Sequence, residues 1–163
     1  MVNLLLNKII DRPTSKKISK QLKDENKKIV FTNGCFDILH SGHVEYLIKA
    51  KELGDILFVG VNTDSSVRKL NKGSNRPINT LESRMFVLSG LFSTDFIVPF
   101  EEETPIDLIK LISPNILTKG GDYLNNQIVG SEYVKTYGGQ VICLPFKEGY
   151  STTKIISKIN SYQ

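Results

Sequence analysis

The sequence has few cysteines, and their positions match no cross-linked or metal-bound scaffold. Two of its 163 residues are cysteine, Cys35 and Cys143, and they form neither a CxxC pair nor, with histidine, the spacing of a zinc site. No signal peptide is visible at the N-terminus, so we expect free thiols in a reducing cytoplasm. Glycine and proline are also scarce, with 12 and 6 residues, which excludes a collagen-like or low-complexity chain.

The sequence also lacks a long hydrophobic run. Residues 2–10 are apolar, but Asn3, Asn7 and Lys8 interrupt them, and the run is far shorter than the roughly 20 residues that span a bilayer. We therefore expect no membrane association. The chain is 40% hydrophobic, which excludes a disordered chain, and its length suits a single domain with a self-sufficient core.

Positive charge is concentrated at one end of the chain. The net charge is +4, and residues 1–28 contain eight lysines and arginines against three acidic residues, so the rest of the chain is close to neutral. We interpret residues 1–28 as a basic helical N-terminal extension whose charges face solvent, followed by a main domain over residues 29–163. An RNA-binding module is the alternative that the basic start suggests. Because the main domain is near neutral, we expect no nucleic-acid partner.

Strand-like and helix-like segments alternate after the extension. Continuously apolar or β-branched segments predict strands at 29–33, 56–62, 95–100, 115–118 and 140–145. Helical spacing and capping residues predict helices at 43–53, 63–70, 80–91, 104–112, 131–137 and 151–159. Buried strands separated by helices indicate a parallel sheet covered on both faces, and right-handed crossovers favour a doubly wound order. We therefore predict a single doubly wound, Rossmann-like α/β domain with a five-stranded parallel sheet.

Both histidines of the chain, His40 and His43, lie directly after the first predicted strand. In a doubly wound sheet, ligands bind beyond the carboxyl ends of the strands. A helix begins at this point, and the free N–H groups and dipole of its first turn favour anions. Gly42 allows a ligand to approach the backbone closely, and the imidazoles can donate hydrogen bonds to phosphoryl oxygens. The alternative is one capping and one core histidine; a zinc site lacks a third ligand.

Several other segments contain groups that can bind anions or hydroxyls, and each of them also has a purely structural interpretation. Gly149 and the cluster Ser151–Thr153 open the last helix and form a second phosphate cradle or an ordinary N-cap. Lys119 to Asp122 (KGGD) end the fourth strand and form a contact to nucleotide or sugar, or a β-turn. Three basic residues supply mobile positive charge or are solvated surface bases: Lys72, Arg76 and Arg84. Asn62 and Asp64 follow the second strand, where they can hold a substrate hydroxyl, although Asp64 also fits a helix cap.

The segment GCFDILHSGH resembles the GxFDxxHxGH signature of the HxGH nucleotidyltransferase superfamily. Over about residues 28–159 the chain resembles one branch of it, the D-glycero-β-D-manno-heptose 1-phosphate adenylyltransferases. The motifs that carry this resemblance are TNGCFDILHSGHVEYL, VGVNTDSSVRKL, RPIN, LESR, EEETP, TKGGDY and EGYSTT. On this resemblance, residues 29–163 are the nucleotidyltransferase domain.

The resemblance implies that ATP and the sugar 1-phosphate react, with Mg²⁺, to give ADP-heptose and pyrophosphate. The implied catalytic residues are His40, His43, Lys72 and Arg84. The implied nucleotide-binding residues are Asn33, Gly34, Cys35, Phe36, His40, Gly42, His43, Lys119, Gly120, Gly149, Ser151, Thr152 and Thr153. The implied substrate-binding residues are Asn62, Asp64, Arg76 and Asp122, and no residue is expected as a metal ligand. We interpret Cys35 as a small buried residue rather than a nucleophile, and Asp37 as a brace of its loop.

The resemblance further implies a cytoplasmic enzyme, a homodimer as one arrangement, and a separate sugar kinase upstream. Two alternatives stay open. The first is a cytidylyltransferase that acts on a polyol phosphate, but Phe146 stands where glycerol-phosphate cytidylyltransferases carry the arginine of a pattern like RTEGISTT. The second is a non-catalytic nucleotide-binding regulator, which the combination of His40, His43, Lys72 and Arg84 disfavours.

Overall fold

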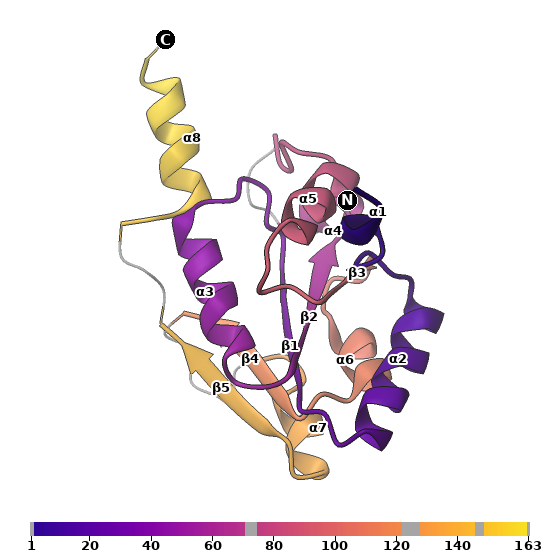
Figure 1. Cartoon of the computed structure of the whole chain (residues 1–163). Helices are drawn as coiled ribbons and strands as arrows, with labels where there is room; N and C mark the ends of the chain where they lie inside the picture. Colours follow the sequence, from indigo (N-terminus) through magenta and orange to yellow (C-terminus); the bar gives the residue numbers. More distant parts are fainter. Residues whose placement is uncertain (1, 71–74, 122–127, 146–148, 163) are drawn as a thin grey trace.

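The computed structural model describes residues 2–70, 75–121, 128–145 and 149–162 of the chain (Figure 1). The helices are α1 (Val2–Leu6), α2 (Arg12–Asp24), α3 (Ser41–Lys51), α4 (Asp64–Lys69), α5 (Leu81–Ser89), α6 (Ile106–Ile112), α7 (Ser131–Thr136) and α8 (Thr152–Asn160). The strands are β1 (Ile29–Gly34), β2 (Ile56–Asn62), β3 (Phe96–Phe100), β4 (Ile116–Gly120) and β5 (Gln140–Leu144). No described helix is long and apolar enough to cross a bilayer.

The described strands form one five-stranded sheet in the order β3-β2-β1-β4-β5, and all its strand pairs are parallel. The chain builds from β1 outward to β3, then crosses to the other side of β1 to add β4 and β5. The predicted doubly wound five-stranded fold is confirmed. The strand order reverses between β1 and β4, which is where this architecture binds ligands.

Alternate residues of the central strands face two apolar clusters. Val30 of β1 packs in one cluster with α3 and α5, whereas Phe31 packs in the other with α6 and α7. Ile18 and Leu22 of α2 extend the second cluster. Figure 1 shows these helices on the two faces of the sheet. Burial on both faces explains why the strands are continuously apolar.

Helix starts match the predicted caps. Thr63, Thr80 and Ser151 each accept a hydrogen bond from a backbone N–H in the first turn of the following helix. The predicted boundaries lie within two residues of the observed ones, and two of the shifts concern the end of the sheet where ligands bind. α3 begins at Ser41 with His40 as its N-cap, and β4 continues to Gly120 because that residue still pairs with Leu144 of β5.

The basic N-terminal segment is helical, and it is also bound to the sheet. Ile97 of β3 donates its N–H to Lys8 O (2.8 Å) and accepts from Ile10 N (3.0 Å), so the segment pairs with the sheet edge. Lys23 Nζ donates to Ile112 O at 2.7 Å. The interpretation as a solvated face therefore holds for Lys16, Lys17 and Lys20, which are exposed, but not for every basic residue.

Candidate functional site

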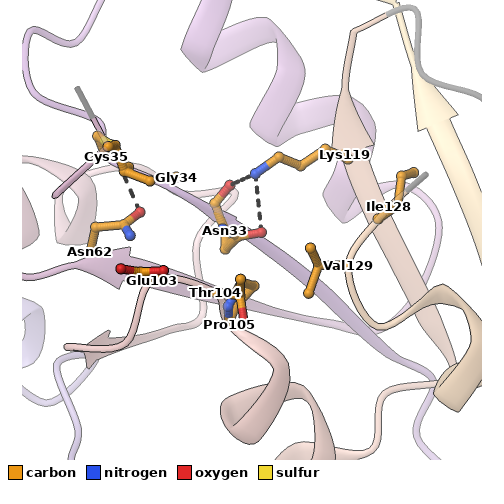
Figure 2. Close-up of a pocket in the computed structure, with 11 residues that line it drawn as sticks. Asn33, Gly34, Cys35, Asn62, Glu103, Thr104, Pro105, Lys119, Ile128 and Val129 are labelled. Carbon is orange, nitrogen blue, oxygen red and sulfur yellow. Dashed lines mark hydrogen bonds between the residues drawn. The ribbon is translucent and has the colours of Figure 1, made fainter. Parts of the chain in front are cut away.

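The carboxyl ends of β1 and β4 meet at the point where the strand order reverses. There Lys119 of β4 reaches across to Asn33 of β1, and its Nζ donates to Asn33 O (2.9 Å) and Oδ1 (3.1 Å). Figure 2 shows this contact among the residues that line one cavity. Asn33, Gly34, Cys35 and Lys119 also line a second cavity. A single ammonium group therefore lies where ligands of the two cavities would meet.

The larger cavity, of about 440 Å³, is named here the His43 cavity. It is lined by Asn33, Gly34, Cys35, Phe36, Asp37, His43, Tyr46, Arg76, Lys119, Gly120, Thr152 and Thr153. Nine of the predicted nucleotide-binding residues are in this set: Asn33, Gly34, Cys35, Phe36, His43, Lys119, Gly120, Thr152 and Thr153. Residues from the ends of β1 and β4 and the starts of α3 and α8 thus converge on one space, with basic side chains and helix N-termini that suit an anion.

A smaller cavity of about 200 Å³ adjoins it and is lined by His40, Gly42, His43, Tyr46, Tyr150, Ser151 and Thr152. His40, Gly42 and Ser151, which were also predicted to bind nucleotide, lie here. Gly149 has φ +87°, a left-handed conformation that favours glycine, and it leads the chain into this wall. A Cβ at Gly42 would lie 3.1 Å from the His40 ring and 3.3 Å from Tyr150 Cβ, so a larger residue here would push these two side chains away by a few tenths of an ångström.

The two imidazoles lie against each other at the start of α3. Their ring centroids are 3.8 Å apart with planes inclined by 28°. The backbone N–H of His40 donates to Nδ1 of His43 at 3.4 Å. Because an imidazole nitrogen that accepts carries no proton, the neutral His43 ring carries its proton on Nε2. His43 is thus oriented to donate a hydrogen bond through Nε2.

Burial lowers the pKa of His40 below its ordinary value of 6.5. We expect an NMR titration of the two histidines, on protein without a histidine tag and assigned with His40→Gln, to give His40 a pKa below 6.5. As pH falls, His40 is then protonated in the unfolded chain before it is protonated in the folded chain. The free energy of unfolding therefore starts to fall near pH 6.5, and the loss is complete below the lower pKa of the folded state. A His40 pKa at or above 6.5 would contradict the burial seen here.

Asp37 braces the loop after β1, as predicted. Its fully buried carboxylate accepts from the backbone N–H groups of Ile78 (2.9 Å) and Asn79 (2.8 Å) and from Arg76 Nε (2.5 Å). The expectation that Arg76 is a mobile cation is therefore corrected: its guanidinium lines the His43 cavity but is paired with Asp37. The pair leaves Arg76 partly neutralised and fixed in place.

Replacing Asp37 with asparagine is expected to lower the free energy of unfolding by about 1–3 kcal/mol, since charge-assisted hydrogen bonds to buried donors are lost. Urea denaturation measures this change. Asp24→Asn is the matched control, because Asp24 is exposed at the end of α2 and should change stability by at most about 0.5 kcal/mol. Equal effects of the two substitutions would show that Asp37 is not a brace.

Arg84 is held in place by its neighbours, although the sequence suggested a mobile cation. Its side chain is fully buried, and the guanidinium donates to Cys35 O (2.5 Å), Asn62 O (2.8 Å), Asp64 Oδ1 (2.7 Å) and Asn79 O (3.1 Å). The guanidinium is therefore fixed rather than mobile, and the implied catalytic role of Arg84 stays a prediction. The guanidinium ties the loop after β1 to the end of β2.

The remaining predicted residues divide into three groups. Cys35 is buried, and its Sγ donates to Asn62 Oδ1 at 3.8 Å, as expected for a small structural residue. Asn62 lines the second cavity, whereas Asp64 caps no helix and pairs with Arg84. Lys72, Asp122 and Phe146 lie outside the described residues.

The second shared cavity, of about 320 Å³, is named here the Glu103 cavity. It is lined by Asn33, Gly34, Cys35, Asn62, Leu70, Glu103, Thr104, Pro105, Lys119, Ile128 and Val129. From the sequence, Glu103 was included only within the EEETP motif and was assigned no role. Tyr46, which lines the His43 cavity and bonds Thr32 Oγ1 at 2.6 Å, was missed as well; burial raises its pKa to about 12. The spacing of three residues after His43 could have placed Tyr46 on the same helix face.

The family comparison matches residues 31–158 to the cytidylyltransferase-like family. The chain is 53% identical over 152 residues to the bifunctional protein HldE of Wolinella succinogenes, covering 93% of this chain and 31% of that protein. It is 56% identical over 146 residues to the bifunctional protein HldE of Actinobacillus pleuropneumoniae, covering 90% and 30%. The chain thus spans about a third of the length of these curated relatives.

Two solved structures share the fold. The lipopolysaccharide core biosynthesis protein from Thermoplasma volcanium has a TM-score of 0.61 at 30% identity, over 77% of this chain and 99% of that one. The pantoate-beta-alanine ligase from Francisella tularensis has a TM-score of 0.61 at 19% identity, over 94% and 77%, and supports the fold alone. The predicted nucleotidyltransferase class is confirmed at the level of the family. The chain belongs to the cytidylyltransferase-like family.

Proposed function

We propose that this chain transfers the adenylyl group of ATP to D-glycero-β-D-manno-heptose 1-phosphate and releases pyrophosphate. The observation that carries the proposal is the convergence of His43, Lys119 and the N-termini of α3 and α8 on one cavity, which shares a wall with a second. The name of the lipopolysaccharide core biosynthesis protein, which is 30% identical to this chain, supports a role in surface-glycan synthesis. ADP-heptose would serve as the sugar donor for such a glycan.

The reaction needs no base and no covalent intermediate. A phosphate monoester has its second pKa near about 6, so the acceptor is largely dianionic at neutral pH. One of its oxygens attacks the α-phosphorus of ATP, the bond from that phosphorus to the bridging oxygen breaks, and pyrophosphate leaves with the electron pair. The protein therefore has to hold the reactants in line and offset negative charge.

Described residues of the His43 cavity meet both requirements. His43 Nε2–H donates to an oxygen of the transferring phosphate, while its Nδ1 accepts from the His40 backbone N–H. The amides at the start of α3 and α8 and the hydroxyls of Thr152 and Thr153 bind the departing phosphates. Lys119 lines both cavities. Its ammonium group can therefore offset the negative charge of the acceptor phosphate and of the α-phosphate where the two meet.

The residues present fit Mg²⁺ as a companion of the nucleotide. No group of three or more His, Cys, Asp or Glu residues that could hold a metal occurs in the described part of the chain. Mg²⁺ commonly keeps several waters and is held by substrate phosphates with few protein ligands. When bound, it supplies charge neutralisation on the β- and γ-phosphates. The Asp37 carboxylate already binds Arg76 and the backbone N–H of Ile78, so it is not expected to bind Mg²⁺.

A pyrophosphate-release assay tests the proposal. The four nucleoside triphosphates are each paired with heptose 1-phosphate, mannose 1-phosphate and glycerol 3-phosphate. We expect the highest kcat/KM with ATP and heptose 1-phosphate. A strong preference for CTP and glycerol 3-phosphate would support the polyol-phosphate cytidylyltransferase, and tight ATP binding without turnover would support a nucleotide-binding regulator. Cytoplasmic location, an upstream sugar kinase and a homodimer remain predictions.

A further inference from the structure

The Glu103 cavity has a charge pattern unlike that of the His43 cavity. Its charged lining residues among those described are one cation, Lys119, and one anion, Glu103. Asn33 and Asn62 add amides, and Leu70, Ile128 and Val129 form apolar walls. A triphosphate here would place negative charge against the Glu103 carboxylate. A ligand with one phosphate can instead bind that phosphate at Lys119 and place its neutral polar part at Glu103.

Glu103 is the member of its acidic run that is available to a ligand. Glu102 is paired with Arg12, and Glu101 does not line the cavity. Glu103 itself has an exposed side chain and forms no ion pair or side-chain hydrogen bond within the described residues. Glu103, Asn62 and Thr104 line the same cavity, and in the view of Figure 2 Asn33 lies between Glu103 and Lys119.

We propose that the Glu103 cavity holds the acceptor and that Glu103 determines specificity by binding hydroxyl groups of its sugar. This inference rests on the proposed function and adds the subsite and the recognising residue. An ionised carboxylate only accepts hydrogen bonds, so it suits a partner that donates several, as a polyhydroxylated sugar does. Hydrogen bonds to a charged group are stronger than neutral ones.

The position of Lys119 sets the orientation of this ligand. Its ammonium group lines both cavities, so the acceptor phosphate lies at that end, next to the α-phosphate in the His43 cavity. The sugar then extends toward Glu103 and Asn62 at the ends of β3 and β2. Reversing the ligand would bring its phosphate to the carboxylate and remove the attacking oxygen from the junction.

Calorimetric binding tests the inference, with heptose 1-phosphate titrated into the full chain saturated with a non-hydrolysable ATP analogue. Glu103→Ala is expected to weaken binding of heptose 1-phosphate about 10- to 100-fold, and Glu103→Gln less. Inorganic phosphate, which has no sugar hydroxyls, should bind the variants at least as tightly as the wild type. Glu101→Gln is the matched control and should change neither affinity more than about twofold.

Two results would overturn the inference. One is an unchanged affinity for heptose 1-phosphate in both Glu103 variants, and the other is an equal loss for heptose 1-phosphate and inorganic phosphate. If the wild type still releases pyrophosphate with heptose 1-phosphate, either result leaves the proposed function intact. Failure of the proposed function appears instead in the wild type, as absence of turnover and of sugar-phosphate binding.

Discussion

Replacing His43 with alanine is expected to lower kcat for pyrophosphate release about 10²–10³-fold, the usual cost of one lost donor to a transition-state oxygen. The Kd for ATP should rise much less, because Lys119, the helix N-termini and the hydroxyls of Thr152 and Thr153 remain. His40→Ala is expected to have an effect of the same order, since its ring stacks on His43 at 3.8 Å. Steady-state kinetics and ATP titration by calorimetry measure the two quantities separately.

Ser41→Ala is the matched control for both histidines. Ser41 is exposed in the same helical turn and lines neither cavity at this end of α3, so its kcat should stay within about twofold of the wild type. Thermal melting verifies that every variant is folded. A His43→Ala enzyme with normal kcat and a large loss of ATP affinity would assign His43 to ground-state binding instead.

Replacing Arg84 with alanine is expected to lower the free energy of unfolding by about 2–4 kcal/mol, because it leaves the buried carbonyls of Cys35 and Asn62 unsatisfied and breaks a partly buried ion pair with Asp64. Arg84→Lys should cost about 1–3 kcal/mol, since one ammonium cannot reproduce the fork that reaches Cys35 O, Asn62 O and Asp64. Urea denaturation gives these values.

Arg68→Ala provides the comparison for Arg84. Arg68 is exposed on α4, so its loss should change stability by at most about 0.5 kcal/mol. If Arg84→Ala does not fold, the lysine variant still reports the loss. Stability of Arg84→Lys equal to that of the wild type, together with a large fall in kcat, would return Arg84 to a direct role at the phosphates.

The sheet was predictable from sequence because its strands are buried on both faces. The segment 56–61 is apolar throughout, and β2 covers it together with Asn62, as the predicted strand 56–62 does. The His40–His43 pair was predictable as well, since its position after a strand and at a helix start depends on local sequence. Lys119 was predicted at the end of the fourth strand, and the resemblance implied its role; that this strand neighbours β1 is a finding of the structure.

The roles of Arg84 and Glu103 depend on tertiary contacts that local sequence does not encode. Arg84 meets Cys35 O across 49 residues and Asn62 O across 22, so nothing near it in the sequence signals its burial. Glu101, Glu102 and Glu103 are consecutive, and the sequence alone does not distinguish their roles. The pairing of Glu102 with Arg12 and the turn before α6 decide which of them faces the cavity.

The central claim is that the His43 cavity holds the triphosphate of ATP with its α-phosphate at His43. A crystal structure of the chain with Mg²⁺ and α,β-methylene-ATP tests it most directly. We expect an α-phosphate oxygen within about 3.2 Å of His43 Nε2 and the β- and γ-phosphates at the N-terminus of α8. A triphosphate bound outside this cavity, with His43 Nε2 turned away from phosphorus, would contradict it.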